Sequence, residues 1–410
     1  MTRVVIAAMG TRGDVAPLTD VGVRLLAAGH QVVLAASRPF AAEIQRCGLE
    51  FRAMGGDFRE TEIAGASPAK LVLTAVSPAS VRAMGELVLT ALENEKADVL
   101  LLSPWAEFAG HPFAEANGIP SIGVRLQPLS ATAAHPPSVL GAWSLGGPGN
   151  RLAGAAGGAL VDRVYGNVVN DIRARVGLSA TSVSALRRRR TEAGWPILHG
   201  YSPAVVPRPR DWRTGLEVVG YWWPQVVPGW RPPAELVDFL DAGPPPVFLG
   251  FGSVMTGPKA AARLSELALA ALRAAGVRGV IQAGWANLDV RSDDVITIGD
   301  VPHEWLFPRM AAVVHACGAG TTAAGLRAGV PAVGVPVAGD QPFWAYRLRE
   351  LGVSPATVPY WRLTAGRLAA AVQAAVKDPA YGRAAREIAS HLAEEDGAGA
   401  VVKAVEQALC

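Results

Sequence analysis

The chain has 410 residues, half of them hydrophobic and 18% of them charged, which is typical of an ordered globular protein and excludes an extended disordered chain. This length exceeds what one hydrophobic core usually organises, so we expect two domains of similar size. The formal net charge of +3 is too small to indicate a nucleic-acid partner.

Short apolar runs alternate with helical patterns at the start of the sequence. Residues 4–9 form an apolar run that leads into a glycine-containing loop at 10–17, and the helical pattern that follows ends at Gly29. The same alternation predicts strands at 31–35, 99–103 and 119–126 and a helix at 39–47. Apolar strands separated by helices indicate a parallel sheet covered on both faces.

Two irregular stretches interrupt this pattern. Residues 127–158 are rich in proline, glycine and alanine, which predicts a long loop or a mobile helix. Such a segment is either plain surface or a loop that binds an acceptor. Residues 202–246 contain ten prolines amid four tryptophans, and this shift in composition places an interdomain linker there.

After the linker the alternation of strands and helices restarts. A strongly periodic helix is predicted at 259–275, and the alanine-rich stretch 363–410 is helical by period. Apolar runs predict strands at 247–252, 279–283, 295–298, 312–315 and 332–336. We therefore predict an α/β protein with a Rossmann-like doubly wound domain at 1–205, a Pro/Trp-rich linker at 206–235, a second such domain at 236–395 and a C-terminal helix at 396–410 that could pack back on the first domain.

Other features bear on location and partners. Cys47, Cys317 and Cys410 are too scattered for a disulfide framework or a metal site, and a strand begins almost directly after Met1 without a secretion signal. Apolar runs end well short of the roughly 20 residues that a membrane span needs. We expect a cytoplasmic protein without integral membrane association and of unknown oligomeric state. Residues 187–190 are four arginines, which indicate a solvated face or a phosphate- or membrane-docking site.

Two glycine-bounded loops lie where a strand gives way to a helix, at residues 10–17 and 315–322. Open α/β sheets bind ligands at the carboxyl ends of their strands, and backbone amides at a helix N-terminus attract anions. Gly318 and Gly320 would let the backbone approach a diphosphate, and Thr321 could donate a hydrogen bond to it. Tight packing of helix against strand would explain such glycines equally well.

Further motifs follow in the second half: Gly-Phe-Gly-Ser-Val at 250–254, Val-Pro-His-Glu-Trp-Leu-Phe-Pro at 301–308, the loop at 315–322 and Gly-Asp-Gln-Pro-Phe-Trp at 339–344. In this order they resemble the nucleotide-sugar-binding lobe of family 1 glycosyltransferases, particularly sterol glucosyltransferases and bacterial enzymes that glycosylate antibiotic aglycones. Gly-Thr-Arg-Gly-Asp-Val at 10–15 is similar to the first lobe of that subgroup. The resemblance implies the GT-B fold, with two lobes facing each other across a cleft.

The resemblance implies that Asp14 is the general base. Its carboxylate would deprotonate the acceptor hydroxyl as that oxygen attacks the anomeric carbon from the face opposite the nucleotide, which inverts the anomeric configuration. The alternative is an aspartate that caps the following helix. Arg12 and Gly13 would help to bind the diphosphate across the cleft, and a plain surface arginine is the alternative for Arg12.

On the donor side the resemblance implies three groups of contacts. Val301 and His303 would recognise the nucleobase, and Asp340 and Gln341 would hold sugar hydroxyls, which both donate and accept hydrogen bonds. The diphosphate would lie against Ser253, His315, Gly318, Gly320 and Thr321. The alternatives are a turn serine at Ser253, a buried histidine at His315 and a helix N-cap at Asp340.

The diphosphate loop departs from the family pattern at two positions. Many relatives carry two consecutive histidines at its start, whereas this chain has Ala316 at the phosphate-contacting position, and Cys317 replaces the usual glycine. Donor binding could therefore be weakened or changed, unless His315, the backbone amides and Thr321 compensate.

Together these features predict a metal-independent, inverting glycosyltransferase without a cofactor. Its substrates would be a nucleotide sugar, either UDP-glucose or a dTDP-deoxysugar, and a hydroxyl of an apolar acceptor such as a polyketide, a sterol or another aromatic metabolite. The alternatives are a non-catalytic relative that acts as a partner or activator, suggested by Ala316, and a nucleotide-sugar epimerase. A dehydrogenase is disfavoured because the first loop lacks Gly-x-Gly-x-x-Gly.

Overall fold

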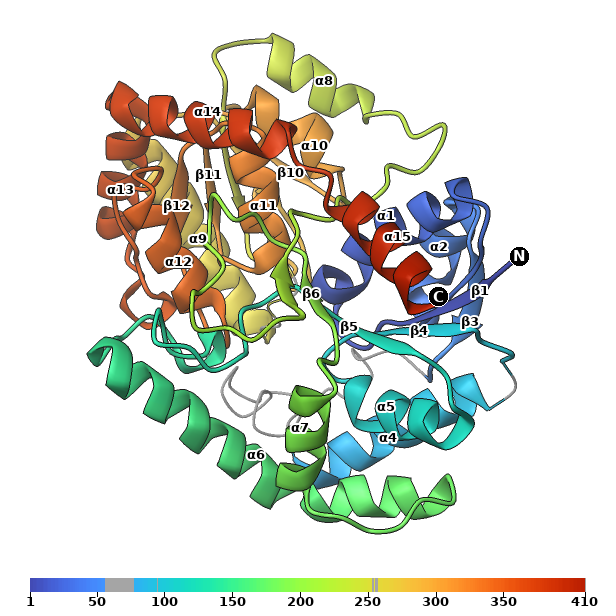
Figure 1. Ribbon diagram of the computed structural model, residues 1–410. Helices are drawn as coiled ribbons and strands as arrows, with labels where there is room; N and C mark the ends of the chain where they lie inside the picture. The colour runs from blue at the N-terminus through green and yellow to red at the C-terminus, as the bar shows by residue number, and fades with distance from the viewer. Residues whose placement is uncertain (56–76, 94, 253, 255–256, 410) are drawn as a thin grey trace.

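The computed structural model describes residues 1–55, 77–93, 95–252, 254 and 257–409, and these form two α/β lobes (Figure 1). The first lobe contains a seven-stranded parallel sheet in the order β3-β2-β1-β4-β5-β6-β7. Its strands are β1 (Arg3–Ala7), β2 (Gln31–Ala36), β3 (Glu50–Ala53), β4 (Val99–Leu102), β5 (Ser121–Arg125), β6 (Ile197–His199) and β7 (Leu216–Val218).

The second lobe contains a five-stranded parallel sheet in the order β10-β9-β8-β11-β12. Its strands are β8 (Val247–Gly250), β9 (Gly279–Gln282), β10 (Val295–Ile298), β11 (Ala312–His315) and β12 (Ala332–Gly334). The predicted class of two doubly wound, parallel-sheet domains is confirmed, because each sheet reverses its strand order beside its first strand.

Helices cover both faces of each sheet. In the first lobe they are α1 (Arg12–Ala27), α2 (Ala41–Arg46), α4 (Pro78–Leu92), α5 (Glu107–Asn117), α6 (Gly146–Arg175) and α7 (Val183–Glu192). After α8 (Ala234–Asp241), the second lobe has α9 (Pro258–Ala275), α10 (His303–Leu306), α11 (Ala319–Arg327), α12 (Gln341–Glu350), α13 (Ala365–Lys377) and α14 (Pro379–Ala393). Short 3-10 helices are η1 (Arg38–Phe40), η3 (Ser138–Leu140), η4 (Phe307–Arg309) and η5 (Tyr360–Arg362).

The apolar runs form strands whose successive residues pack against helices on opposite faces of the sheet. In β1, Val4 and Ile6 pack in a core with α1, whereas Val5 and Ala7 pack in a second core with α4 and α5. A strand that is buried on both faces cannot place a polar residue on either face, which gives the continuous apolar pattern.

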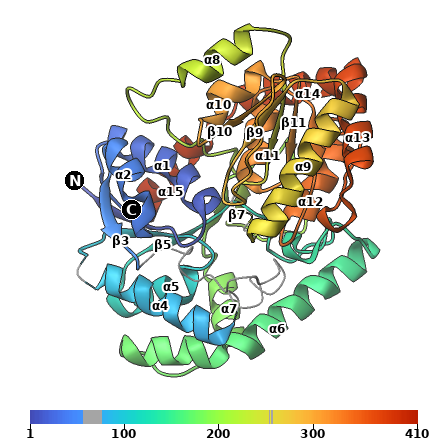
Figure 2. The same ribbon diagram turned by 180° about the vertical axis from the view of Figure 1, so that it is seen from behind.

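The C-terminal helix α15 (Gly397–Ala408) crosses back from the second lobe and lies beside α1 in the first (Figure 1, Figure 2). Val401 and Val405 are fully buried in the same core as Val4 and Ile6. The crossing is tight, because a Cβ atom at Gly397 would lie 2.5 Å from the carbonyl oxygen of Gly220. Gly220 itself has a φ of +97°, so the two chain segments that connect the lobes pass each other through glycines.

The stretch 127–158, predicted as a long loop or a mobile helix, ends in a helix. Residues 146–158 are the start of the 30-residue helix α6, although they contain six glycines, a residue that disfavours helices in isolation. Tertiary packing overrides that preference: the small Gly154 packs on Ala131, and the later residues Val168 and Ile172 are buried in the first-lobe core.

The first loop is also shorter than predicted, because α1 begins at Arg12, so Asp14 lies in a helical turn. The segment predicted as the linker, 206–235, contributes strand β7 to the first sheet. Among the helices that the structure describes, none is long and apolar enough to cross a membrane.

The tie between the crossing segments can be tested at Trp222, whose indole N–H donates to the Gly397 carbonyl at 3.1 Å in a buried position. We expect Trp222→Phe to lower the free energy of unfolding by about 1–3 kcal/mol, because that carbonyl loses its side-chain partner. The control Trp361→Phe removes a side chain that is 73% exposed and should leave the thermal unfolding temperature unchanged. Equal unfolding temperatures for the two variants would contradict this role.

Candidate active site

Asp14 lies in the first turn of α1, the helix that follows β1 at the carboxyl edge of the first sheet. Its Oδ2 accepts hydrogen bonds from the backbone N–H of Thr11 at 2.8 Å and from the Thr11 hydroxyl at 3.1 Å, and Gln127 also donates to the carboxylate. Burial raises the pKa of Asp14 and these donors oppose the rise. Asp14 therefore does cap the helix, and its raised pKa also suits proton transfer.

Gly10 makes this position of Asp14 possible, and sequence reasoning missed its role. A Cβ atom at Gly10 would lie 2.3 Å from Oδ2 of Asp14, and Gly10 has a φ of +147°. Any side chain there would displace the carboxylate. The signal was present in the sequence as a glycine immediately after an apolar strand.

Asp340 and Gln341 lie at the start of α12 in the second lobe. Asp340 occupies the N-cap position without a side-chain capping bond, and its Oδ2 instead accepts from the indole N–H of Trp344 at 2.7 Å. The Gln341 side-chain oxygen accepts from the backbone N–H of Val337 at 2.7 Å, which leaves the amide group of Gln341 as the donor toward a ligand.

Asp14 and Asp340 come from different lobes, and the charge of Asp14 acts on Asp340. Burial is the main cause that raises the pKa of Asp340, to about 6, and the negative charge of Asp14 raises it further. Two groups influence each other in this way only when they lie within several ångströms in a weakly screened region. The predicted base and the predicted sugar-binding carboxylate therefore share one interlobe site.

Arg12 points across the same interlobe region. Its guanidinium forms ion pairs with Glu43 at 3.3 Å and with Asp300 of the second lobe at 3.1 Å. Both pairs are partly solvent-exposed, and such pairs add little to stability, so a ligand phosphate could compete for Arg12. Gly13 lies exposed in the same turn. The contact between Arg12 and Asp300 was not predicted from the sequence, because an exposed acidic residue before a motif does not by itself indicate a functional role.

His315 ends β11 and is buried. Its Nδ1 accepts the backbone N–H of Cys317 at 3.1 Å, which places the proton on Nε2. Nε2 is buried and has no partner within the described part of the chain. Burial lowers the pKa of His315 to about 3, so a neutral imidazole with one unused N–H donor stands at the start of the predicted diphosphate loop.

The rest of this loop leads into α11, whose N-cap is Gly318. A Cβ atom at Gly318 or Gly320 would meet no atom within 4 Å, so open space lies beside the backbone at both positions. Thr321 is partly exposed in the first turn, and the hydroxyl of Thr322 is buried and unpaired among the described residues. The helix N-terminus thus offers N–H and hydroxyl donors next to open space.

The two departures from the family pattern differ in their structural effects. Cys317 has a φ of +61°, a left-handed conformation that disfavours any residue except glycine by about 1–2 kcal/mol. Its thiol is fully buried and its pKa is raised by that burial. At Cys317 the backbone therefore has the conformation that a glycine would favour. Ala316 is buried in the second-lobe core, and its side chain offers no hydrogen bond.

Val301 and His303 lie between β10 and β11, after the outermost strand on the other side of the sheet from β12. Val301 is buried, and the imidazole of His303 stacks on Phe307 with ring centroids 4.3 Å apart. Burial lowers the pKa of His303 to about 4, and the charge of Arg12 lowers it further. His303 is therefore neutral and close to Arg12. Ser253 lies outside the described residues.

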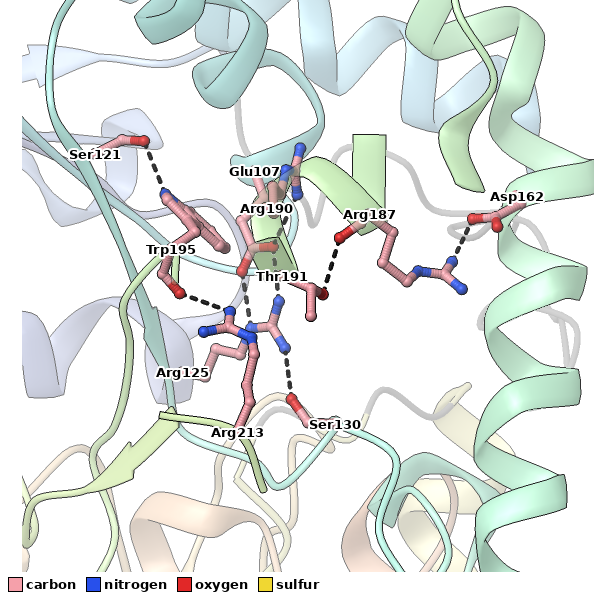
Figure 3. A network of polar contacts seen from close by, with 10 residues as sticks. All are labelled: Glu107, Ser121, Arg125, Ser130, Asp162, Arg187, Arg190, Thr191, Trp195 and Arg213. Atoms are coloured by element: carbon pink, nitrogen blue, oxygen red, sulfur yellow. Dashed lines mark hydrogen bonds and ion pairs between the residues drawn. The ribbon is translucent and has the colours of Figure 1, made fainter. Parts of the chain in front are cut away.

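A charged network supports the carboxyl edge of the first sheet (Figure 3). Glu107, at the start of α5, accepts two hydrogen bonds from Arg125 at 2.8 and 2.7 Å. Arg190 lies 3.9 Å from Glu107 and above the ring of Trp195. The bidentate pair fixes the end of β5, two residues before Gln127, which donates to Asp14.

Aromatic side chains lie at the same edge. Trp105 and Phe108 follow β4, with ring centroids 6.2 Å apart, and both are partly exposed. His135, in the irregular segment after β5, packs edge-on against Phe343 of α12 at 5.2 Å. This segment therefore reaches the second lobe three residues from Asp340. In the described ranges, no group of three His, Cys, Asp or Glu side chains is placed to hold a metal ion.

Two family models match the chain. Residues 4–136 match the glycosyltransferase family 28 N-terminal domain, and residues 282–408 match the erythromycin biosynthesis protein CIII-like C-terminal domain. Together they cover the parts of both lobes that carry Asp14 and Asp340.

Relatives and solved structures agree with these matches. The chain is 36% identical to O-mycaminosyltylonolide 6-deoxyallosyltransferase of Streptomyces fradiae, over 96% of this chain and 94% of that enzyme. It is 34% identical to sterol 3-beta-glucosyltransferase UGT80A2 of Arabidopsis thaliana, over 98% of this chain but only 65% of that protein's length.

The fold is shared with a crystal structure of the glycosyltransferase SsfS6 of Streptomyces sp. SF2575 complexed with thymidine diphosphate, with a TM-score of 0.64, 21% identity and coverage of 99% of this chain and 100% of that one. The identities, the matched domains and the two facing parallel-sheet lobes lead to one conclusion. This chain belongs to the glycosyltransferase family that includes sterol 3-beta-glucosyltransferases and antibiotic glycosyltransferases, and it has their GT-B fold.

Proposed function

We propose that this glycosyltransferase moves a sugar from a nucleotide donor to a hydroxyl of a lipophilic acceptor with inversion, and that Asp14 is its general base. The observation that carries the proposal is that the charge of Asp14 in the first lobe acts on Asp340 in the second. A sugar held by Asp340 and Gln341 would present its anomeric carbon toward the first lobe, where Asp14 could take the proton from the attacking hydroxyl.

The donor diphosphate would bind at the start of α11. The unused Nε2–H of His315, the hydroxyl of Thr321 and the open backbone at Gly318 and Gly320 supply donors there, and the helix N-terminus adds a favourable potential. Arg12 would exchange Asp300 for the departing phosphate, which stabilises the charge that develops as the bond to the sugar breaks. These groups could stabilise the leaving group without a metal ion, so we propose metal-independent transfer, to be tested with EDTA.

The acceptor would lie between the lobes on the first-lobe side. Trp105, Phe108 and the pair of His135 and Phe343 supply aromatic surface near the two carboxylates. The names of the two curated relatives describe a tylonolide and a sterol as acceptors, which supports a bulky, lipophilic molecule here as well.

The first experiment is a thermal-shift titration with UDP, dTDP, UDP-glucose and NAD. A ligand that binds only the folded protein raises its unfolding temperature, so we expect a rise with UDP or dTDP and none with NAD. The responding nucleotide identifies the donor class. If none of the nucleotides raises the unfolding temperature, the result would contradict donor binding. It would favour the alternative that Ala316 suggests, a non-catalytic relative.

We expect Asp14→Asn to reduce kcat by about 10²–10⁴-fold, because a neutral amide cannot accept the proton. Nucleotide binding should remain, since the amide oxygen can still accept from Thr11 and keep the start of α1. Asp20→Asn on the same helix is the matched control: its carboxylate accepts from the backbone N–H of Trp223 and from Gln225, so its turnover should stay within a few-fold. Near-normal turnover of Asp14→Asn would require another base.

The raised pKa of Asp340 predicts the pH dependence of donor binding. Its carboxylate is ionised above pH of about 6 and becomes a poorer acceptor for sugar hydroxyls as the pH falls below that value, so calorimetry should show weaker nucleotide-sugar binding there. In Asp14→Asn the neighbouring charge is gone, and the midpoint should move to lower pH.

The nucleoside diphosphate without its sugar is the control for this experiment, and its affinity should not follow the same midpoint. An identical midpoint for the nucleotide sugar in the wild type and in Asp14→Asn would show that the two carboxylates do not influence each other.

A further inference from the structure

Exposed apolar side chains are concentrated in one short stretch of the first lobe. Fourteen large hydrophobic residues are exposed in the described chain, and eight of them lie within residues 139–164. Single exposed apolar residues are ordinary, whereas a contiguous group marks an interaction surface. We call seven of these residues the apolar surface: Val139, Leu140, Trp143, Leu145, Leu152, Leu160 and Val164. Val161 lies on the other side of α6, seven residues after the buried Gly154.

Most of these residues follow one face of α6. Leu145, Leu152, Leu160 and Val164 are separated by 7, 8 and 4 residues, a spacing that keeps them on one side of a helix. Leu152 is 70% exposed and Leu160 is 62% exposed. The opposite side of α6 packs in the core through residues such as Gly154, Tyr165 and Ile172. The apolar surface is therefore the side of α6 that faces away from the core.

The turn before α6 extends the apolar surface toward the interlobe site. The indole N–H of Trp143 donates to the carbonyl of Leu140 at 2.7 Å, so the ring's polar group is already satisfied and its exposed part is hydrocarbon. This turn belongs to the same irregular segment as His135, which packs against Phe343 of α12. In both views α6 lies at the outer edge of the molecule, and none of the labelled helices and strands of the described chain lies over its outer side (Figure 1, Figure 2).

The run of arginines at 187–190 flanks this surface. Arg187 on α7 pairs with Asp162 on α6 (Figure 3). It also donates to the carbonyl of Gly158 on α6, which fixes α7 along α6, and the pair neutralises the acid. Arg188 and Arg189 are exposed, and Arg188 lies 4.0 Å from the exposed carboxylate of Glu192. Arg163 adds an exposed cation on α6 itself, so an apolar surface is bordered by positive charge.

We propose that this apolar surface docks on an anionic lipid bilayer. Apolar side chains from one helix would enter the boundary between headgroups and acyl chains while Arg163, Arg188 and Arg189 contact lipid phosphates, which is how interfacial helices bind without spanning. The consequence for catalysis rests on the proposed function: the turn at 139–143 would bring the acceptor segment to the membrane, from which a lipophilic acceptor could enter.

A second copy of the chain fits this surface less well. A symmetric dimer brings the same patch of both copies together, so it would also bring together the exposed arginines of two α7 helices and of two α6 helices. That arrangement is repulsive, whereas anionic headgroups are complementary to it.

The test is co-sedimentation of the full chain with vesicles of phosphatidylcholine alone and with vesicles that contain one quarter phosphatidylglycerol. We expect binding to the anionic vesicles that weakens in high salt. The double variant Leu152→Glu/Leu160→Glu should bind at least tenfold less, and Arg188→Glu/Arg189→Glu should lose the dependence on anionic lipid. Trp361→Glu, which replaces a 73% exposed side chain of the second lobe, is the matched control and should bind like the wild type.

Folding of each variant is checked by its unfolding temperature with and without UDP or dTDP, a readout that does not involve the lipid. Lack of vesicle binding by the wild type would overturn the proposal and leave the glycosyltransferase function untouched. A concentration-dependent dimer in light scattering that Leu152→Glu/Leu160→Glu abolishes would also overturn it, because the apolar surface would then be an interface between copies. Failure to bind nucleotide alongside normal vesicle binding would count only against the proposed function.

Discussion

The close passage of the two connecting segments determines how the lobes are joined. Gly220 on the outward segment and Gly397 on the returning one lie backbone against backbone, since a side chain at Gly397 would collide with the carbonyl of Gly220. Trp222 closes this contact from the first lobe, and α15 continues into the core beside α1. Both connections therefore run through one place, and the facing edges of the two sheets depend on it.

Because the sheets are parallel, each gathers its strand-to-helix turns at a single edge. Asp14 comes from the first turn of the helix after β1, and His315 is the last residue of β11. Neither lobe holds both, so the proposed base and the proposed donor site meet only where the lobes are joined. Supporting groups such as Gly10, Gln127 and the pair of Glu107 and Arg125 hold the first-lobe side in place without being reactive themselves.

Much of the fold could be predicted from the sequence, because strands buried on both faces leave continuous apolar runs that no surface segment mimics. The start of α6 could not, since its glycine-rich residues form a helix only through packing on the first lobe. The order of motifs assigned Asp14, Asp340, His315 and His303 to one site through the family resemblance, and their roles stay predictions. The sequence could not show that Arg12 pairs with Asp300, because that contact joins two lobes that are distant in sequence.

The position of Cys317 in the loop between β11 and α11 controls how this cysteine reacts with thiol reagents. Thiol reagents attack the thiolate of an accessible cysteine, and Cys317 is fully buried with a raised pKa, whereas Cys47 is partly exposed. Cys317 becomes reactive only when the loop between β11 and α11 opens. Its rate of alkylation, measured beside that of Cys47, is therefore a reporter of how often this loop leaves its folded conformation, and a ligand seated there would slow it.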